Sequence, residues 1–204
     1  MIPEKHLSEL ICMAKRLGAS DAGIILSADI EINADLAALC NGDHPCSNYG
    51  LSSSCPPHVP GPSRFLQWKN SSKYSIVVRI DVPSVVMFSE ERHEVMQLLH
   101  EIVAGIELQA VEMGYNGSKA FAGGSCKEIF CREHAACQVI SKYGKCRNPL
   151  YARSSMSGFG INVAQLMQSA GWPVKKQILE DKSDTQAMTW VAGLILLEAG
   201  IMKE

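Results

Sequence analysis

The stretch Tyr74–Val82, YSIVVRIDV, is the clearest strand in the sequence, and the other elements are placed around it. Most of its positions hold Ile or Val, whose branched β-carbons favour extended backbone. A second strand is expected at residues 188–198, MTWVAGLILLE, where a helix is the competing interpretation because Ala, Leu and Met also suit one. Shorter strands are expected at residues 22–26 and 119–123, with residues 30–32 as a continuation of the sheet.

The segments between these strands carry the apolar spacing of helices. The longest helix is expected from Ser89, as its N-cap, to Gly114. Others are expected at residues 3–18, from the N-cap Asn33 to Cys40, at residues 62–68, and in the turns that end at Gly171. This alternation predicts an α/β or α+β fold: a single domain over residues 1–204 with a mixed β-sheet flanked by helices.

Two cysteine-rich regions interrupt the alternation, at about residues 40–63 and 123–160, and we expect both to be metal-binding loops inserted at the edge of the domain. The first contains several prolines, which exclude regular helix and central strand. An irregular loop of this length in a compact domain needs an organiser of its own, and its cysteines are the candidates.

The second region reads GGSCKEIFCREHAACQVISKYGKCRNP from Gly123 to Pro149. It contains four cysteines, here called the second set: Cys126, Cys131, Cys137 and Cys146. Thiols this close together are either cross-linked or share a metal. The chain begins with a charged, amphipathic segment that lacks the apolar region of an export signal, so a cytoplasmic location with reduced thiols is expected. That expectation favours a metal over disulfides.

Four thiolates suit either an iron–sulfur cluster or tetrahedral zinc. Structural zinc sites tend to use two tight C-x2-4-C pairs, whereas only the first gap of the second set is that short. The looser spacing favours a [4Fe–4S] cluster, with zinc as the alternative cofactor.

The first region holds three cysteines, here called the first set: Cys40, Cys46 and Cys55. Their spacing repeats that of Cys131, Cys137 and Cys146, so one or two clusters are expected in the chain. No fourth ligand is obvious, and Cys12, His44 and His58 are the candidates, with ordinary exposed loop histidines as the simpler interpretation of the two His residues. His134 is interpreted in the same way. If none of them binds, one metal position stays open to a substrate.

Hydrogen-bond donors crowd the end of the second region at Arg147, Asn148, Arg153, Ser154 and Ser155. Such donors could bind cluster sulfurs and raise the reduction potential, or hold an anion near the next helix. The alternative interpretation of these donors is a solvated loop with capping residues. No Ser-His-Asp or Cys-His arrangement follows from the spacing, so no catalytic residue is assigned.

The segments CSNYGLSSSCPPHVPG and GGSCKEIFCREHAACQVISKYGKCRNPLYARSSMSGFGINVAQLMQSAGW resemble a family of bacterial and archaeal proteins described as predicted metal-binding, a domain of unknown function. The resemblance covers most of the chain, from about Ile24 to the last strand. It implies cysteine ligation of a metal, with an iron–sulfur cluster as the expected form, in organisms with anaerobic metabolism. The family cysteines correspond to all seven members of the two sets. The family often has an aromatic residue near Ser54 and a proline at Ser154, so this chain departs from it there.

The overall charge of the chain argues against nucleic acid as a partner. The chain has 19 basic and 21 acidic residues, which gives no broad electrostatic footprint for nucleic acid. Its longest apolar run, residues 187–197, is about half the length needed to cross a bilayer, so no membrane span is expected.

The function expected is electron transfer with a redox protein partner. The alternatives are an enzyme that uses a three-cysteine cluster with an open iron, and a zinc-stabilised interaction module.

Overall fold

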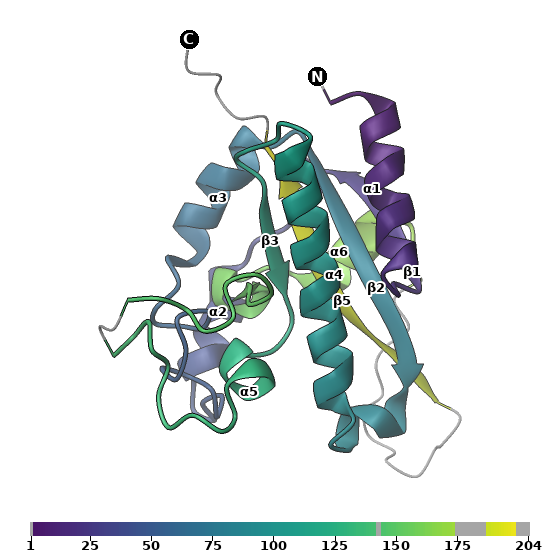
Figure 1. The fold of residues 1–204 in the computed structure, drawn as a ribbon. Coiled ribbons are helices and arrows are strands. Elements are labelled where there is room, and N and C mark those ends of the chain that lie inside the picture. The colour runs from purple at the N-terminus through teal and green to yellow at the C-terminus, as the bar shows by residue number, and fades with distance from the viewer. Residues whose placement is uncertain (1, 142–143, 174–186, 199–204) are drawn as a thin grey trace.

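A mixed five-stranded sheet forms the centre of the computed structural model, which describes residues 2–141, 144–173 and 187–198 (Figure 1). The strand order is β1-β2-β5-β3-β4, and neighbours are antiparallel except β3 and β4, which are parallel. The strands are β1 Asp21–Leu26, β2 Tyr74–Pro83, β3 Lys119–Ala122, β4 Ser154–Ser155 and β5 Met188–Leu197.

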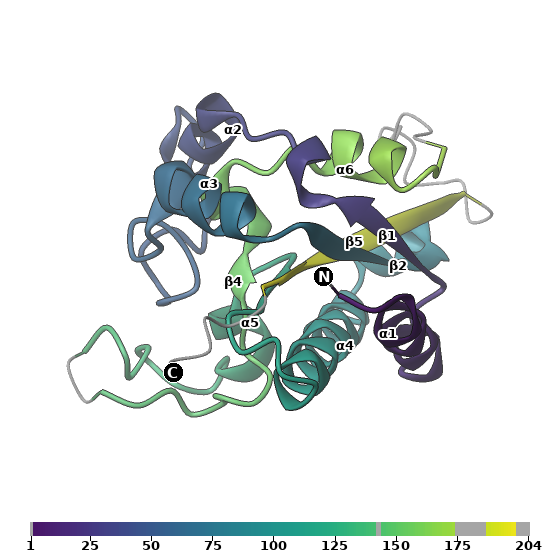
Figure 2. The same cartoon turned by 90° about the horizontal axis from the view of Figure 1, so that it is seen from above.

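Helices cover both faces of this sheet (Figure 2). One face packs against α1 Glu4–Arg16 and α4 Arg92–Glu112, and the other against α3 Gly61–Ser71, the 3-10 helix η4 Met156–Phe159 and α6 Val163–Ser169. The remaining short elements are η1 Ser27–Asp29, α2 Ala34–Ala38, η2 Leu39–Asn41, η3 Ser84–Phe88 and α5 Cys126–Phe130.

The side chains of β2 alternate between the two cores. Ile76, Val78 and Ile80 are buried under α4, while Val77 is buried on the α3 side. Because both faces of the central strands are covered, their sequences read as nearly continuous apolar runs rather than as an alternation of apolar and polar residues. This burial explains why the stretch at residues 74–82 is such a clear signal.

Gly193 in the middle of β5 allows α4 to pack closely on the sheet. A Cβ at this position would overlap the Val103 side chain of α4 and would lie 3.2 Å from Val78 Cγ2. The absence of a side chain at Gly193 therefore sets how near the long helix lies to the two central strands.

An aromatic cluster on the opposite face supports the first cysteine region. The rings of Phe65, Phe121 and Phe159 are buried, with centroids 5.0 to 5.7 Å apart. Next to Phe159, Gly158 packs against the Pro56 ring, and a Cβ there would lie 3.0 Å from Pro56 Cδ. The loop that carries Cys55 thus rests on the hydrophobic core through η4.

The mixed sheet with flanking helices confirms the predicted fold and defines it as α+β. The carboxy-terminal segment is the strand β5, so its alternative interpretation as a helix is wrong. The expectation that residues 30–32 continue the sheet is wrong. Ile30 enters the core, and Ile32 makes only an isolated bridge with Ile161. The reason is that the 3-10 turn η1 redirects the chain after β1. The two-residue strand β4 was not expected.

The observed helix boundaries differ from the predicted ones by one to a few residues. Helix α4 begins at Arg92, after the predicted N-cap Ser89, whose hydroxyl accepts a hydrogen bond from the Glu91 N–H. Helix α3 begins at Gly61. Across the residues that the structure describes, no helix has the length and apolar character needed to cross a membrane.

Candidate metal centres

The two cysteine regions lie next to each other beside the β3–β4 edge of the sheet. The Ser155 N–H of β4 donates to the Ser54 carbonyl oxygen at 2.9 Å, which ties the first region to the edge strand. The second region leaves the sheet after β3, forms α5 and a long loop that extends from the body, and returns at β4 (Figures 1 and 2). All eight cysteines are free thiols.

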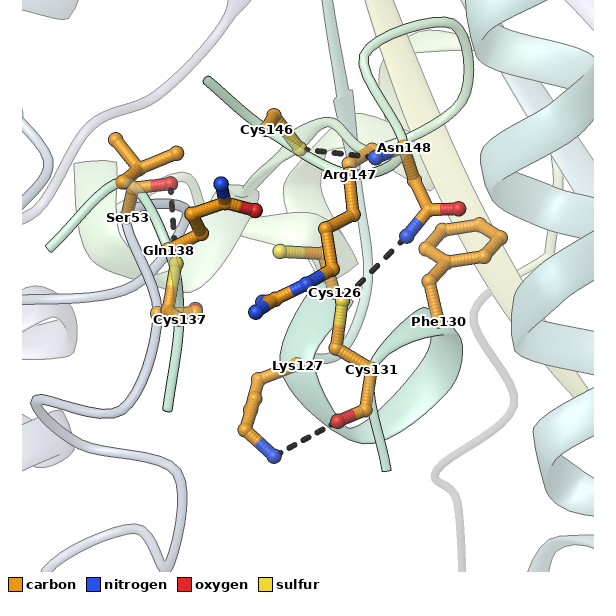
Figure 3. Close-up of a pocket in the computed structure, with 13 residues that line it drawn as sticks. Ser53, Cys126, Lys127, Phe130, Cys131, Cys137, Gln138, Cys146, Arg147 and Asn148 are labelled. Carbon is orange, nitrogen blue, oxygen red and sulfur yellow. Dashed lines mark hydrogen bonds between the residues drawn. The ribbon is translucent and has the colours of Figure 1, made fainter. Parts of the chain in front are cut away.

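The second set shares one cavity (Figure 3). Cys126 is the first residue of α5, Cys131 ends that helix, and Cys137 and Cys146 come from the loop that follows. The cavity between them holds about 20 Å³, which is close to the space of one water molecule. A larger metal group would require the loop to move outward.

Asn148 donates hydrogen bonds to two sulfur atoms of the second set (Figure 3). Its backbone N–H lies 3.3 Å from Cys146 Sγ, and its side-chain Nδ2 lies 3.4 Å from Cys131 Sγ. Arg147 lines the same cavity, but its guanidinium donates to the Ala136 carbonyl. Arg153 donates to Glu107, so Asn148 is the member of the expected donor cluster that contacts sulfur.

The thiols of the second set differ in acidity. Burial raises the pKa of Cys137, but hydrogen bonds from backbone N–H groups, with Ser53 first, and from the Ser53 hydroxyl outweigh it and lower the pKa overall. Burial raises the pKa of Cys126 to about 11, although the hydroxyls of Ser54 and Ser52 act in the opposite direction. Metal binding at Cys126 must therefore displace a tightly held proton.

The first set lines a much larger cavity of about 590 Å³. Burial raises the pKa of Cys40, and the negative charges of the Cys46 and Cys55 thiolates raise it further, which places the three thiols within electrostatic range. The Cys46 N–H also donates to the Cys40 carbonyl at 3.2 Å. The remaining lining is mixed: apolar side chains such as Leu36 and Val163 alternate with hydroxyl and amide groups.

The proposed fourth ligands of the first set lie elsewhere. Cys12 is exposed on α1, which covers the opposite face of the sheet. His44 is exposed, and the ring of His58 contacts the Gly50 carbonyl through Nε2 at 3.2 Å. Within the described part of the chain, none of these three residues lines the cavity of the first set. His134 is exposed as well, in agreement with a loop histidine.

Ser54 connects the two sets. Its hydroxyl donates to Cys126 Sγ at 3.0 Å and lies 3.9 Å from Cys55 Sγ, so these two sulfur atoms are at most about 7 Å apart. Ser52 and Ser125 extend the hydroxyl cluster. Cys55 and Cys126 are also the two buried cysteines, each with 7% of its surface exposed. The two sets therefore meet at their most buried members.

His100 joins the start of the second region to the segment just before β4. Its Nε2–H donates to the Gly123 carbonyl, and its Nδ1 accepts from the Arg153 N–H, both at 3.2 Å. The ring is fully buried and packs edge-on against Phe130 of α5. Burial lowers the pKa of His100 to about 4, so the ring is neutral at physiological pH. This role could not be predicted from the sequence, because His100 lies within the helix α4 and no motif distinguishes it.

Glu128 of α5 is a second functional candidate that the cysteine spacing did not reveal. Its carboxylate accepts from Asn48 Nδ2 at 2.8 Å and pairs with Arg92 and His93 at the start of α4. Burial raises the pKa of Glu128, but the Asn48 hydrogen bond and the Arg92 charge lower it overall, so the carboxylate is ionised. The feature of the sequence that could have indicated Glu128 is its position between two cysteines, Cys126 and Cys131.

The kinds of ligand in these two regions, rather than their positions, suit a thiolate-bound metal group. Four cysteines share a cavity, sulfur atoms accept N–H hydrogen bonds, and soft sulfur ligands suit iron–sulfur clusters or zinc. In the described residues, no three His, Cys, Asp or Glu side chains converge closely enough to hold a single metal ion.

Comparison with known proteins agrees with this chemistry. The family Predicted metal-binding protein (DUF2284) matches residues 23–197. No curated protein and no solved structure matches the chain. Because the family covers most of the sequence, including all seven cysteines of the two sets, the chain belongs to this family of predicted metal-binding proteins of unknown function.

Proposed function

We propose that this metal-binding protein is an iron–sulfur protein that exchanges electrons with a redox partner. The second set would hold a [4Fe–4S] cluster, and the first set would hold a second metal group. The observation that carries the proposal is the shared cavity of four cysteines whose sulfur atoms accept hydrogen bonds from Asn148. When bound, such a cluster supplies a one-electron carrier.

The protein residues would set the properties of that carrier. Hydrogen bonds from Asn148 to the sulfurs of Cys131 and Cys146 withdraw electron density from them and favour the reduced state. The Ser54 hydroxyl would do the same at Cys126. Because Ser54 also contacts Cys55, it offers a short path for electrons between the two sets. A cytoplasmic, reducing location is part of the proposal, since it keeps the thiols available.

The charge of the second region supports a negatively charged redox partner. Residues 126–153 contain six Lys or Arg and two Glu, although the whole chain carries a net charge of -2. Arg132, Lys145 and Arg147 are exposed, and so are Leu150 and Tyr151 in the segment that follows Arg147. Exposed basic side chains together with exposed apolar ones suit brief docking of an acidic electron carrier.

Anaerobic purification of the full-length protein, followed by iron, sulfide and zinc analysis and visible and EPR spectroscopy, tests the proposal. Two [4Fe–4S] clusters would give about eight irons per chain, and one cluster about four. Cys131→Ser should lower the iron content, whereas the matched variant Cys12→Ser should leave it unchanged. A colourless protein that holds only zinc after anaerobic reconstitution would refute the iron–sulfur assignment and favour a structural zinc module.

A further inference from the structure

Helix α5 separates the cavities of the two cysteine sets. Cys126, Lys127, Phe130 and Cys131 line the cavity of the second set, whereas Glu128 lines the cavity of the first set. Cys126 and Phe130 lie four apart on α5 and share one side of the helix, and Glu128 lies on another side. The one acidic residue of α5 therefore lines the same cavity as the three cysteines of the other region.

The Glu128 carboxylate is held in place from two sides. Asn48 follows Cys46 by two residues, and its Nδ2 donates to Glu128 Oε2 at 2.8 Å. Arg92 and His93 contact Oε1. A carboxylate has about four lone-pair positions, so Oε2 keeps one for a metal after accepting from Asn48. Carboxylates that bind metals are commonly oriented by hydrogen bonds of this kind.

We propose that Glu128 is the fourth ligand of the first set, so that three thiolates and one carboxylate hold the metal group there. This inference rests on the proposed function, because it requires a metal at the first set. Of the residues that line the cavity of Cys40, Cys46 and Cys55, Glu128 is the acidic one. Cys12, His44 and His58 do not line this cavity.

The spread of the donors favours a polynuclear group over a single ion. Ligand atoms of one zinc ion lie about 2.0 to 2.3 Å from a common centre, and among the described residues no three His, Cys, Asp or Glu side chains converge that closely. An iron–sulfur cluster has separate metal atoms for each ligand and fits widely spaced donors. A carboxylate is a harder ligand than a thiolate and binds iron of such a cluster less firmly. The iron at Glu128 would be the first to leave on oxidation.

The test compares three variants of the full-length, anaerobically reconstituted protein. Glu128→Ala should lose about one iron per chain after mild oxidation with ferricyanide and should gain the EPR signal of a three-iron cluster. Glu128→Cys restores a ligand, so it should keep the wild-type iron content with a shifted midpoint potential. Glu90→Ala is the matched control, because Glu90 pairs with Arg132 and His93 in the same charge network but does not line the cavity.

Two results would overturn the inference while the proposed function stands. Wild-type protein with two clusters and Glu128→Ala with identical iron content, EPR spectrum and potential would show that Glu128 does not bind. A wild-type spectrum that changes with cyanide as strongly as that of Glu128→Ala would show an open iron. Wild-type protein without iron would instead refute the proposed function itself.

Discussion

Acidification should lower the stability of this protein through the buried ring of His100. The ordinary pKa of histidine is 6.5, and burial lowers the pKa of His100 in the folded protein to about 4. Between these two values the unfolded chain binds a proton that the folded chain does not, so the free energy of unfolding falls as the pH decreases. For one group with these pKa values, the loss from pH 7 to pH 5 is about 2 kcal/mol.

The structure gives the reason for this cost. A proton on Nδ1 of His100 would face the Arg153 N–H, which is itself a donor, and the charged ring would be buried without a carboxylate partner among its hydrogen bonds. Protonation would therefore release the Arg153 N–H, while the hydrogen bond from Nε2–H to the Gly123 carbonyl would remain.

Urea unfolding of wild-type protein and His100→Gln at pH 7, 6 and 5 measures the effect. The neutral glutamine does not titrate, so the variant should be less stable at pH 7 but should lose about 2 kcal/mol less than wild-type protein between pH 7 and pH 5. His58→Gln, at an exposed loop position, should follow the wild-type pH dependence. If wild-type protein and His100→Gln lose equal stability over this range, the buried neutral histidine is not the cause.

Three further predictions address packing and thiol reactivity. Gly193→Ala should lower the free energy of unfolding by about 1 to 3 kcal/mol in urea titrations because the added methyl overlaps α4, and an unchanged midpoint would contradict that close packing. Phe65→Ala should cost about 3 to 5 kcal/mol, whereas Leu66→Ala, at a partly exposed position, should cost much less; equal losses would argue against the aromatic core. In reduced, metal-free protein at pH 8, iodoacetamide should modify Cys137 before Cys126, because the pKa of Cys137 is lowered and that of Cys126 is raised to about 11. Peptide mass spectrometry would reveal the opposite order if those environments are wrong.

Most elements of the fold were predictable because they depend on neighbours along the chain. The β-branched run at residues 74–82 and the spaced apolar residues of α4 are local patterns, and the structure confirms both. Strand β4 was not predictable, since its two residues become a strand only by pairing with Phe121 and Ala122. The failure at residues 30–32 has the same origin, because an apolar segment can enter the core without joining the sheet.

The cysteine spacing by itself predicted the two sets and a metal as what they hold, because thiols brought close along a reduced chain are expected to share a metal rather than to be cross-linked. Only the tertiary structure decided how the sets are related. It places Cys55 and Cys126 on either side of one serine hydroxyl, closes the second region with His100, and directs Glu128 toward the first set. These contacts join residues far apart in sequence, and they form only when the sheet brings β3 and β4 together and α5 folds between the two cavities.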